Sequence, residues 1–264
     1  MVLKMSFAVT VIFISFSALL GASMGSFLNV VASRTVEDRP WWGGERSTCD
    51  SCGKELSPGE LVPLLSWVFL SGKCRSCGAK IPLRYFGVEA AGAVTGALIA
   101  WRWGFSPTAA FASVVACGLF LNALTDLYSG YVYDLFAWGL GAAGLLMRVG
   151  GGLNGLIDGL LGAVLGFAVI AAIIILSRGG MGWGDASLMA GTGAALGWKL
   201  TAWGLYLGFM TGGVVAVSLL VLKLVKRKDA IPLGPFLALG GLLSMLSGPW
   251  FFRFLGMTLS WPWS

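Results

Sequence analysis

Long uncharged apolar runs, separated by short polar segments, dominate this chain. A helix that crosses the roughly 30 Å hydrocarbon layer of a bilayer needs about 20 predominantly apolar residues. Five runs approach or exceed that length without a charged residue, so we predict that each forms a transmembrane helix. They are residues 5–33, 103–125, 159–177, 200–222 and 230–252.

Three weaker apolar runs, at 82–101, 132–147 and 186–198, are short or contain an acidic residue. Counting them predicts an all-α membrane protein with about eight transmembrane helices. The composition agrees with this fold class, because 57% of the 264 residues are hydrophobic and only 11% are charged. A soluble domain contains about a quarter charged residues.

The basic residues indicate how the helices are oriented. Eight of the 18 lie in one hydrophilic stretch from Arg34 to Arg84. Basic residues between spans are retained on the cytosolic side of a membrane. With the amino terminus outside, eight spans place 13 of the 18 inside, including the cluster at 223–228. We therefore expect a cytosolic first loop and both chain ends outside.

Two alternatives exist for these segments. The first run could be a cleaved signal peptide, since Lys4 precedes an apolar stretch, but the uncharged run continues to Ser33 and is too long for one. The basic loop could bind nucleic acid, but six acidic residues between Glu37 and Glu60 are mixed into it. We therefore expect a retained helix and no nucleic-acid partner.

Two further patterns are typical of helices packed in lipid. Trp250, Trp261 and Trp263 cluster near the outer end of the last predicted span, as an interfacial anchor would. Glycines four residues apart recur within the predicted spans and allow two helices to approach closely. These pairs are Gly21/Gly25, Gly92/Gly96, Gly155/Gly159, Gly162/Gly166 and Gly208/Gly212.

The first loop contains two CxxC pairs, Cys49/Cys52 and Cys74/Cys77. Four thiolates at this spacing suit a tetrahedral Zn²⁺ site with no open position, so we predict a metal that folds the loop. Two disulfides are the alternative, which a reducing cytosol disfavours. The prediction divides the chain into a first transmembrane helix (1–33), a cytosolic zinc-binding loop (34–84) and a multi-helix membrane domain (85–264).

The chain contains no histidine, which excludes Ser-His-Asp hydrolases, Ser-His membrane proteases and HExxH metalloproteases. Catalysis would have to use carboxylates, thiols, amines or hydroxyls. Ionisable residues within spans are costly, so each is a candidate functional group. The candidates are Glu89, Asp126, Asp134, Asp158 and Asp185.

Asp126 and Asp185 form the best candidate pair. Both are expected at cytosolic helix ends, and two adjacent carboxyls can share a proton, so that one activates water while the other protonates a scissile carbonyl. Asp134 is eight residues from Asp126, about 12 Å along a continuous helix, whereas Asp185 comes from another helix and can meet it. Gly182 and Gly184 would let a substrate backbone come close to Asp185. The alternative is that both aspartates merely cap helices at the interface.

Several segments, in chain order, resemble the type IV prepilin peptidases, bacterial members of the GxGD membrane aspartic proteases. The two CxxC pairs and a GMGWGD box are among them. The other segments are GSFLNVV at 25–31, PLLSW at 63–67, IPLRY at 81–85 ahead of Glu89, DLYSGYVYD at 126–134 and IPLGPFLA at 231–238.

The resemblance implies a multi-pass enzyme of the bacterial inner membrane. Such an enzyme removes the basic leader of prepilins or type II secretion pseudopilins after a glycine, on the cytosolic side, with Asp126 and Asp185 as the catalytic pair. It also implies N-methylation of the new amino terminus with S-adenosylmethionine, for which the four-cysteine loop argues; a protease without methyltransferase activity is the alternative. A proton-coupled transporter and an inactive zinc-containing scaffold are rival functions from other classes. The oligomeric state stays open.

Overall fold

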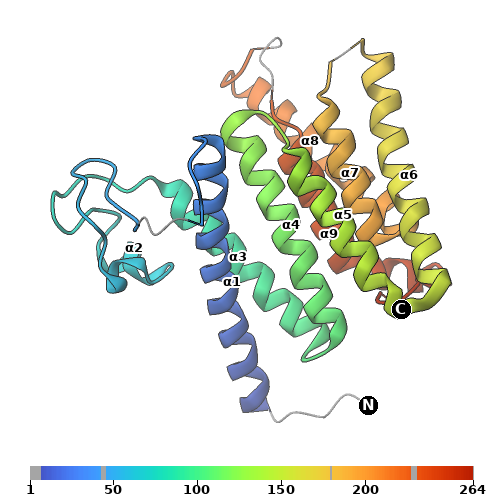
Figure 1. Ribbon diagram of the computed structural model, residues 1–264, viewed down its shortest axis with the longest axis horizontal. Helices are drawn as coiled ribbons and strands as arrows, with labels where there is room; N and C mark the ends of the chain where they lie inside the picture. The colour runs from blue at the N-terminus through green and yellow to red at the C-terminus, as the bar shows by residue number, and fades with distance from the viewer. Residues whose placement is uncertain (1–6, 43–45, 179, 227–230, 264) are drawn as a thin grey trace. The chain divides into compact units, whose positions relative to one another are not determined.

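The computed structural model describes residues 7–42, 46–178, 180–226 and 231–263, and the regular elements within these ranges are helices apart from two isolated β-bridges. The chain divides into two compact units, Met1–Phe105 and Ser106–Ser264. Figure 1 shows the helices of each unit. Lys4, Arg227 and Lys228, which contribute to the expected charge distribution, lie outside the described residues.

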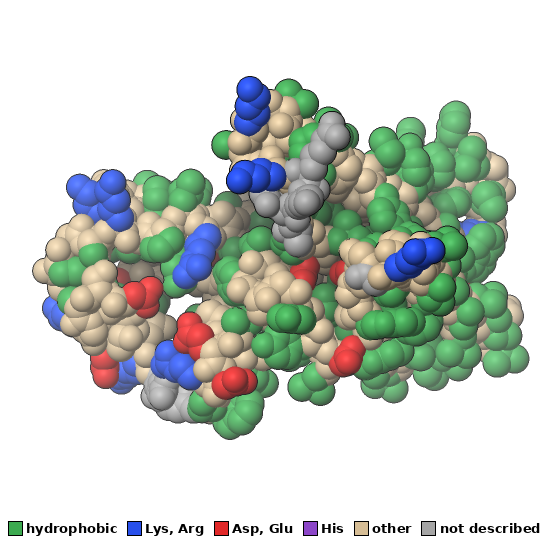
Figure 2. Space-filling view, turned by 90° about the horizontal axis from the view of Figure 1, so that it is seen from above, with side chains coloured by type: hydrophobic (Ala, Val, Ile, Leu, Met, Phe, Trp, Pro, Cys, Tyr) green, Lys and Arg blue, Asp and Glu red, His purple; other side chains and the backbone are tan. Residues whose placement is uncertain are grey.

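The first unit contains two long helices, α1 (Phe7–Val36) and α3 (Leu83–Trp103). The segment between them carries the four cysteines, a 3₁₀ turn η1 (Pro58–Leu61) and the short helix α2 (Leu65–Phe69). Figure 2 shows acidic and basic side chains gathered over this part of the unit.

Glycines bring α1 and α3 into backbone contact. A Cβ atom on Gly21 would collide with the carbonyl oxygen of Gly92, and one on Gly96 would collide with that of Ser17. A Cβ on Gly25 would lie 2.9 Å from the carbonyl oxygen of Val88. The prediction that these glycine pairs pack helices is confirmed, and any larger residue would push the two backbones apart.

The second unit contains six helices. They follow one another in chain order from α4 to α9. Their bounds are α4 (Pro107–Ser129), α5 (Asp134–Arg148), α6 (Gly152–Leu176), α7 (Trp183–Leu196), α8 (Trp198–Val221) and α9 (Gly234–Phe254). A 3₁₀ turn, η2 (Val149–Gly151), separates α5 from α6.

Helix α7 is enclosed by protein. Every residue from Asp185 to Leu196 is buried, because small residues let neighbouring helices approach its backbone. Gly191 packs against Ala137 of α5, and Gly193 packs against Gly162 of α6. A helix sheltered in this way needs no lipid-facing apolar surface, which explains why its sequence has only a weak transmembrane pattern.

The eight long helices correspond to the eight predicted ones, but only five segments are long and apolar enough to count as candidate spans. One of these segments, Asp134–Leu176, covers both α5 and α6. α3 and α7 are not among the five, so the described residues support a multi-pass helical membrane protein without establishing eight crossings. Figure 2 shows hydrophobic side chains over much of the second unit, as a lipid-facing surface requires.

The α1–α3 contact gives a test with a matched control on one helix. Gly92→Ala places a methyl group against the Gly21 backbone, whereas Gly87→Ala meets nothing within 4 Å. We expect Gly92→Ala to lower the stability of the first unit by about 1–3 kcal/mol, the usual cost of overpacking. Thermal unfolding of the full chain in detergent measures this. If Gly87→Ala and Gly92→Ala unfolded at the same temperature, the helices could not be this close.

Candidate active site and four-cysteine cluster

Asp126 lies in the last turn of α4 and is only 5% exposed. The backbone N–H of Gly234, the first residue of α9, donates a hydrogen bond of 2.9 Å to its Oδ2 atom. The first N–H groups of a helix have no partner within the helix and carry partial positive charge. The start of α9 therefore supplies a donor and a favourable field to this buried carboxyl.

Gly234 is required by this arrangement. A Cβ atom at this position would lie 2.6 Å from Oδ2 of Asp126, well inside van der Waals contact. In the sequence, Gly234 is one residue of the 231–238 motif, and nothing in that motif indicates a role for it. A Gly-Pro pair at a helix start is the only signal in the sequence, and it does not reveal which carboxyl the N–H would meet.

Asp185 is the third residue of α7 and is 8% exposed. Gly182, the residue before the helix, accepts a hydrogen bond from the Asp185 backbone N–H. A Cβ on Gly184 would lie 2.8 Å from Cβ of Val132, which belongs to the loop between α4 and α5. This loop therefore packs directly on the glycine-aspartate box, a contact that the sequence did not indicate.

The structure places Asp126 and Asp185 on neighbouring helices. They come from α4 and α7 of the same unit, which contact each other, and both side chains are buried. Each carboxyl is next to the amino-terminal end of a helix, α9 for Asp126 and α7 for Asp185. Two carboxyls in this setting can share one proton, which is the requirement for activating water between them.

The other candidate acids are not part of this pair. Asp134 is exposed at the start of α5. Glu89 belongs to the first unit, where its carboxylate accepts hydrogen bonds from Ser26 Oγ and from the backbone N–H of Leu64, both at 2.8 Å. Asp158 pairs with Arg148 at 3.0 Å. Glu89 and Asp158 thus have structural partners of their own.

The four cysteines of the first unit converge on one point. Their Sγ atoms all lie within 4.8 Å of one another, and Cys49 Sγ is 3.9 Å from Cys77 Sγ. A tetrahedral Zn²⁺ with Zn–S bonds of about 2.3 Å separates its sulfurs by roughly 3.8 Å, so the cluster fits this metal. All four cysteines are free, which contradicts the disulfide alternative.

The two CxxC pairs are built in the same way. The backbone N–H of Gly53 donates to the carbonyl of Cys49, and that of Gly78 donates to the carbonyl of Cys74. Both glycines have the positive φ values expected from the sequence, 69° and 71°. Matching turns thus present the thiols of both pairs to the common centre.

Backbone groups also favour the thiolate of Cys74. The N–H groups of Cys77 and Ser76 donate to its sulfur and lower the pKa of this thiol to about 7. Because thiolates and not thiols bind zinc, this turn prepares a ligand before the metal arrives. A metal held by four sulfurs would have no open position for water, so the cluster suits a structural metal.

Comparison with known protein families gives two matches along the chain. Residues 19–103 match the family model described as the bacterial peptidase A24 N-terminal domain, and residues 113–217 match the type IV leader peptidase family. The two matched stretches lie within the two structural units.

Individual relatives agree with these families. A prepilin leader peptidase/N-methyltransferase of Pseudomonas aeruginosa is 32% identical over 89% of this chain and 91% of its own length. Proteins of the same description from Stutzerimonas stutzeri and Bacillus subtilis are 30% and 32% identical, over 89% and 77% of this chain and 91% and 82% of their own lengths. No solved structure matches the chain significantly.

The cysteine cluster gives a metal-binding test with an internal control. We expect the purified chain to bind one Zn²⁺, and Cys49→Ser to lower its metal content severalfold, because a lost thiolate opens the tetrahedral site. Cys117→Ser changes the fifth cysteine, which lies in α4, and should leave zinc content unchanged. Metal analysis and the thiolate-to-metal absorption of the cobalt form measure both. Equal zinc content in the two variants would contradict the assignment.

Proposed function

Because the chain belongs to the type IV prepilin leader peptidase/N-methyltransferase family, we propose that it removes the basic leader of type IV prepilins or type II secretion pseudopilins. Cleavage follows a glycine and occurs on the cytosolic side of the bacterial inner membrane. Asp126 and Asp185 are the catalytic pair. The observation that supports this assignment is that both carboxyls are buried at helix ends, on two helices that contact each other.

The reaction uses one shared proton. The ionised carboxylate takes a proton from water, and the resulting hydroxide attacks the carbonyl carbon of the last glycine of the leader. The neutral carboxyl donates its proton to the carbonyl oxygen, which gives a tetrahedral diol. As the diol collapses, the ionised carboxylate takes a proton from a diol hydroxyl, the C–N bond breaks, and the neutral carboxyl protonates the leaving amine, so the pair again holds one proton.

The positions of the carboxyls suit a cytosolic leader. Asp126 lies near the carboxyl end of α4 and Asp185 near the amino end of α7, the ends that the distribution of basic residues assigns to the cytosol. The substrate's own transmembrane helix stays in the bilayer while its basic leader reaches this side. The four-cysteine cluster would stabilise the first loop there and take no part in bond cleavage.

Methylation of the new amino terminus, with S-adenosylmethionine as the methyl donor, is the second half of the proposal. It rests on the family relationship, since the relatives carry both activities in their descriptions. A protease without methyl transfer is the alternative.

One experiment separates these possibilities. A prepilin-like peptide with a basic leader that ends in glycine before phenylalanine is incubated with the purified chain and S-adenosylmethionine, and the products are weighed by mass spectrometry. A mature product carrying one methyl group supports both activities, and an unmethylated product supports the protease alone. If the folded protein cleaved none of several such substrates, the result would favour the rival function, an inactive zinc-containing scaffold.

The catalytic pair is tested by replacing each aspartate separately. Asp126→Asn can still accept the Gly234 N–H bond through its amide oxygen, so the fold should persist while proton sharing is lost. We expect Asp126→Asn and Asp185→Asn each to lower the rate of cleavage by at least about 10³-fold. Each change removes one acid–base group, and the remaining carboxyl cannot act without its partner. Asp134→Asn, an exposed neighbour, is the control and should keep its activity. Substantial cleavage by either catalytic variant would refute the pair.

The role of Gly234 predicts a further loss of rate. In Gly234→Ala the added methyl group displaces the Asp126 carboxyl, and a shift of about 1 Å can cost about 10²-fold in rate. We expect kcat to fall and KM to change little, because the substrate-binding surface is retained. Gly213→Ala in α8, which meets nothing within 4 Å, is the matched control. Equal kcat values for the two variants would show that the Gly234 contact does not position the carboxyl.

A further inference from the structure

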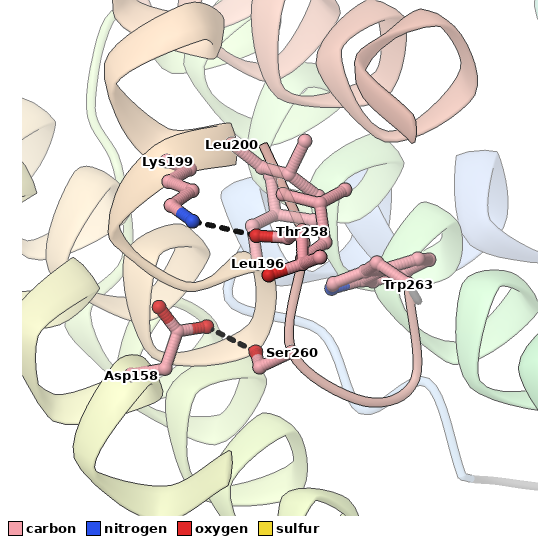
Figure 3. Close-up of a pocket in the computed structure, with 8 residues that line it drawn as sticks. Asp158, Leu196, Lys199, Leu200, Thr258, Ser260 and Trp263 are labelled. Atoms are coloured by element: carbon pink, nitrogen blue, oxygen red, sulfur yellow. Dashed lines mark hydrogen bonds between the residues drawn. The ribbon is translucent and has the colours of Figure 1, made fainter. Parts of the chain in front are cut away.

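A cavity of about 230 Å³ lies in the second unit where α7 ends and α8 begins. Asp158, Lys199 and Ser260 give it polar groups, and Leu196, Leu200 and Trp263 are among its apolar walls. Figure 3 shows Lys199 and Asp158 with the segment that carries Thr258 and Ser260. The volume is below that of a pocket for a drug-sized ligand, typically 300–1,000 Å³, but it suits a small polar group.

This cavity is separate from the candidate active site. Asp185 is in the first turn of α7 and Leu196 is its last residue, so about 16 Å of helix lies between them at 1.5 Å per residue. No step of peptide cleavage uses its polar groups. The charge distribution that places the two aspartates inside places this end of α7 outside.

Lys199 makes one side of the cavity favourable for an anion. It is the second residue of α8, whose first N–H groups have no partner within the helix and carry partial positive charge. Its ammonium group donates to the carbonyl oxygen of Thr258, which leaves two further N–H donors on the same nitrogen. Helix N-termini bind anions and lysine is a common phosphate ligand, so the two together suit a phosphate oxygen.

Asp158 makes another part of the cavity favourable for a cation. Its Oδ2 atom accepts hydrogen bonds from Arg148 at 3.0 Å and from Ser260. Within the described residues no donor reaches Oδ1, and Figure 3 shows the two oxygens pointing apart. Oδ1 is thus an acceptor that an ammonium group could use.

The Asp158 carboxylate is also held rigidly. Arg148 is completely buried and additionally donates to the carbonyls of Ala195 at 2.9 Å and Gly155 at 3.1 Å. These bonds connect the end of α5 to α6 and α7. A fixed guanidinium fixes its carboxylate partner, so the acceptor is preorganised before a ligand binds.

We propose that this cavity binds the headgroup of a phosphatidylethanolamine molecule from the outer leaflet. The phosphate would meet Lys199 and the start of α8, and the primary ammonium would donate to Oδ1 of Asp158. Lys199 and Asp158 both line the cavity, so each charge of a zwitterionic headgroup would have a partner of opposite sign there. The apolar walls formed by Leu196, Leu200 and Trp263 would contact the glycerol region.

Two exposed tryptophans favour a lipid over a soluble ligand of the same chemistry. Trp198 begins α8 beside the cavity and is 41% exposed, and Trp250 near the end of α9 is 67% exposed. Indole rings concentrate at the headgroup level of membranes, so they place this end of the unit where headgroups are. Trp263, expected from the sequence as an interfacial anchor, is instead buried and forms part of the cavity wall.

Native mass spectrometry of the full chain, delipidated and then titrated with single lipids, tests the proposal. We expect one phosphatidylethanolamine to bind about tenfold more tightly than phosphatidylcholine, which has the same phosphate but no N–H donor on its quaternary nitrogen. The difference corresponds to one charge-assisted hydrogen bond. Phosphatidylglycerol, which has no ammonium group, should also bind more weakly. Equal binding of the three lipids would overturn the proposal.

A variant pair locates the site. Lys199→Gln should lower phosphatidylethanolamine affinity about tenfold by removing the charge that meets the phosphate. Lys223→Gln, beyond the opposite end of α8, should leave it unchanged. Equal affinities for these variants would place the lipid elsewhere, and displacement by soluble O-phosphoethanolamine at equal concentration would overturn the lipid as the ligand. Binding is measured without substrate, so the result is independent of the proposed cleavage.

Discussion

The second unit depends on one constraint, which is that ionisable carboxyls are buried in a bundle of apolar helices. A buried charge without compensation is strongly destabilising. Asp158 is compensated by the guanidinium of Arg148, whereas Asp126 is compensated by the first N–H of α9 and Asp185 lies in the first turn of α7. The difference matters for chemistry, because a permanent cation favours the ionised form of its partner. Helix ends also favour the ionised form, but they stabilise the carboxyl without a permanent counter-ion that would hold it in an ion pair.

For a helix end to stabilise a buried carboxyl, its backbone must come very close to that side chain and to neighbouring backbone. Glycines allow this approach because they have no Cβ atom. Gly234 admits the Asp126 carboxyl, and Gly184 admits Val132 of the neighbouring loop. Small residues act in the same way along the whole of α7. Gly191 and Gly193 let this helix pack closely against α5 and α6. Close packing of this kind leaves the carboxyls little room to move. It therefore holds both carboxyls in defined positions, and the second unit gains rigidity and site geometry from the same residues.

Hydrophobic runs, charges and cysteine spacing were sufficient to predict the eight long helices, the four-thiol cluster and the placement of Asp126 and Asp185 at helix ends. These features depend on local pattern or on composition, which the sequence carries directly. The contacts of Gly234 with Asp126 and of Gly184 with Val132 could not be predicted, because they join residues 108 and 52 positions apart. Arg148 shows the same limit. From the sequence, Arg148 was only one of the basic residues expected outside. In the structure its five hydrogen bonds reach residues of α6, of α7 and of the segment near the carboxyl terminus.

The length of α7 connects the two ends of the second unit. Its 14 residues span about 21 Å, whereas the hydrocarbon layer is about 30 Å thick. If the proposed lipid site holds the Leu196 end at headgroup level on one side, the Asp185 end stops several ångströms inside the hydrocarbon boundary on the other. In the proposed reaction the leader bond lies beside the substrate's transmembrane helix and would be presented at that depth. A lipid headgroup bound at the far end of α7 would thus help to set the depth at which the carboxyl pair meets its peptide bond.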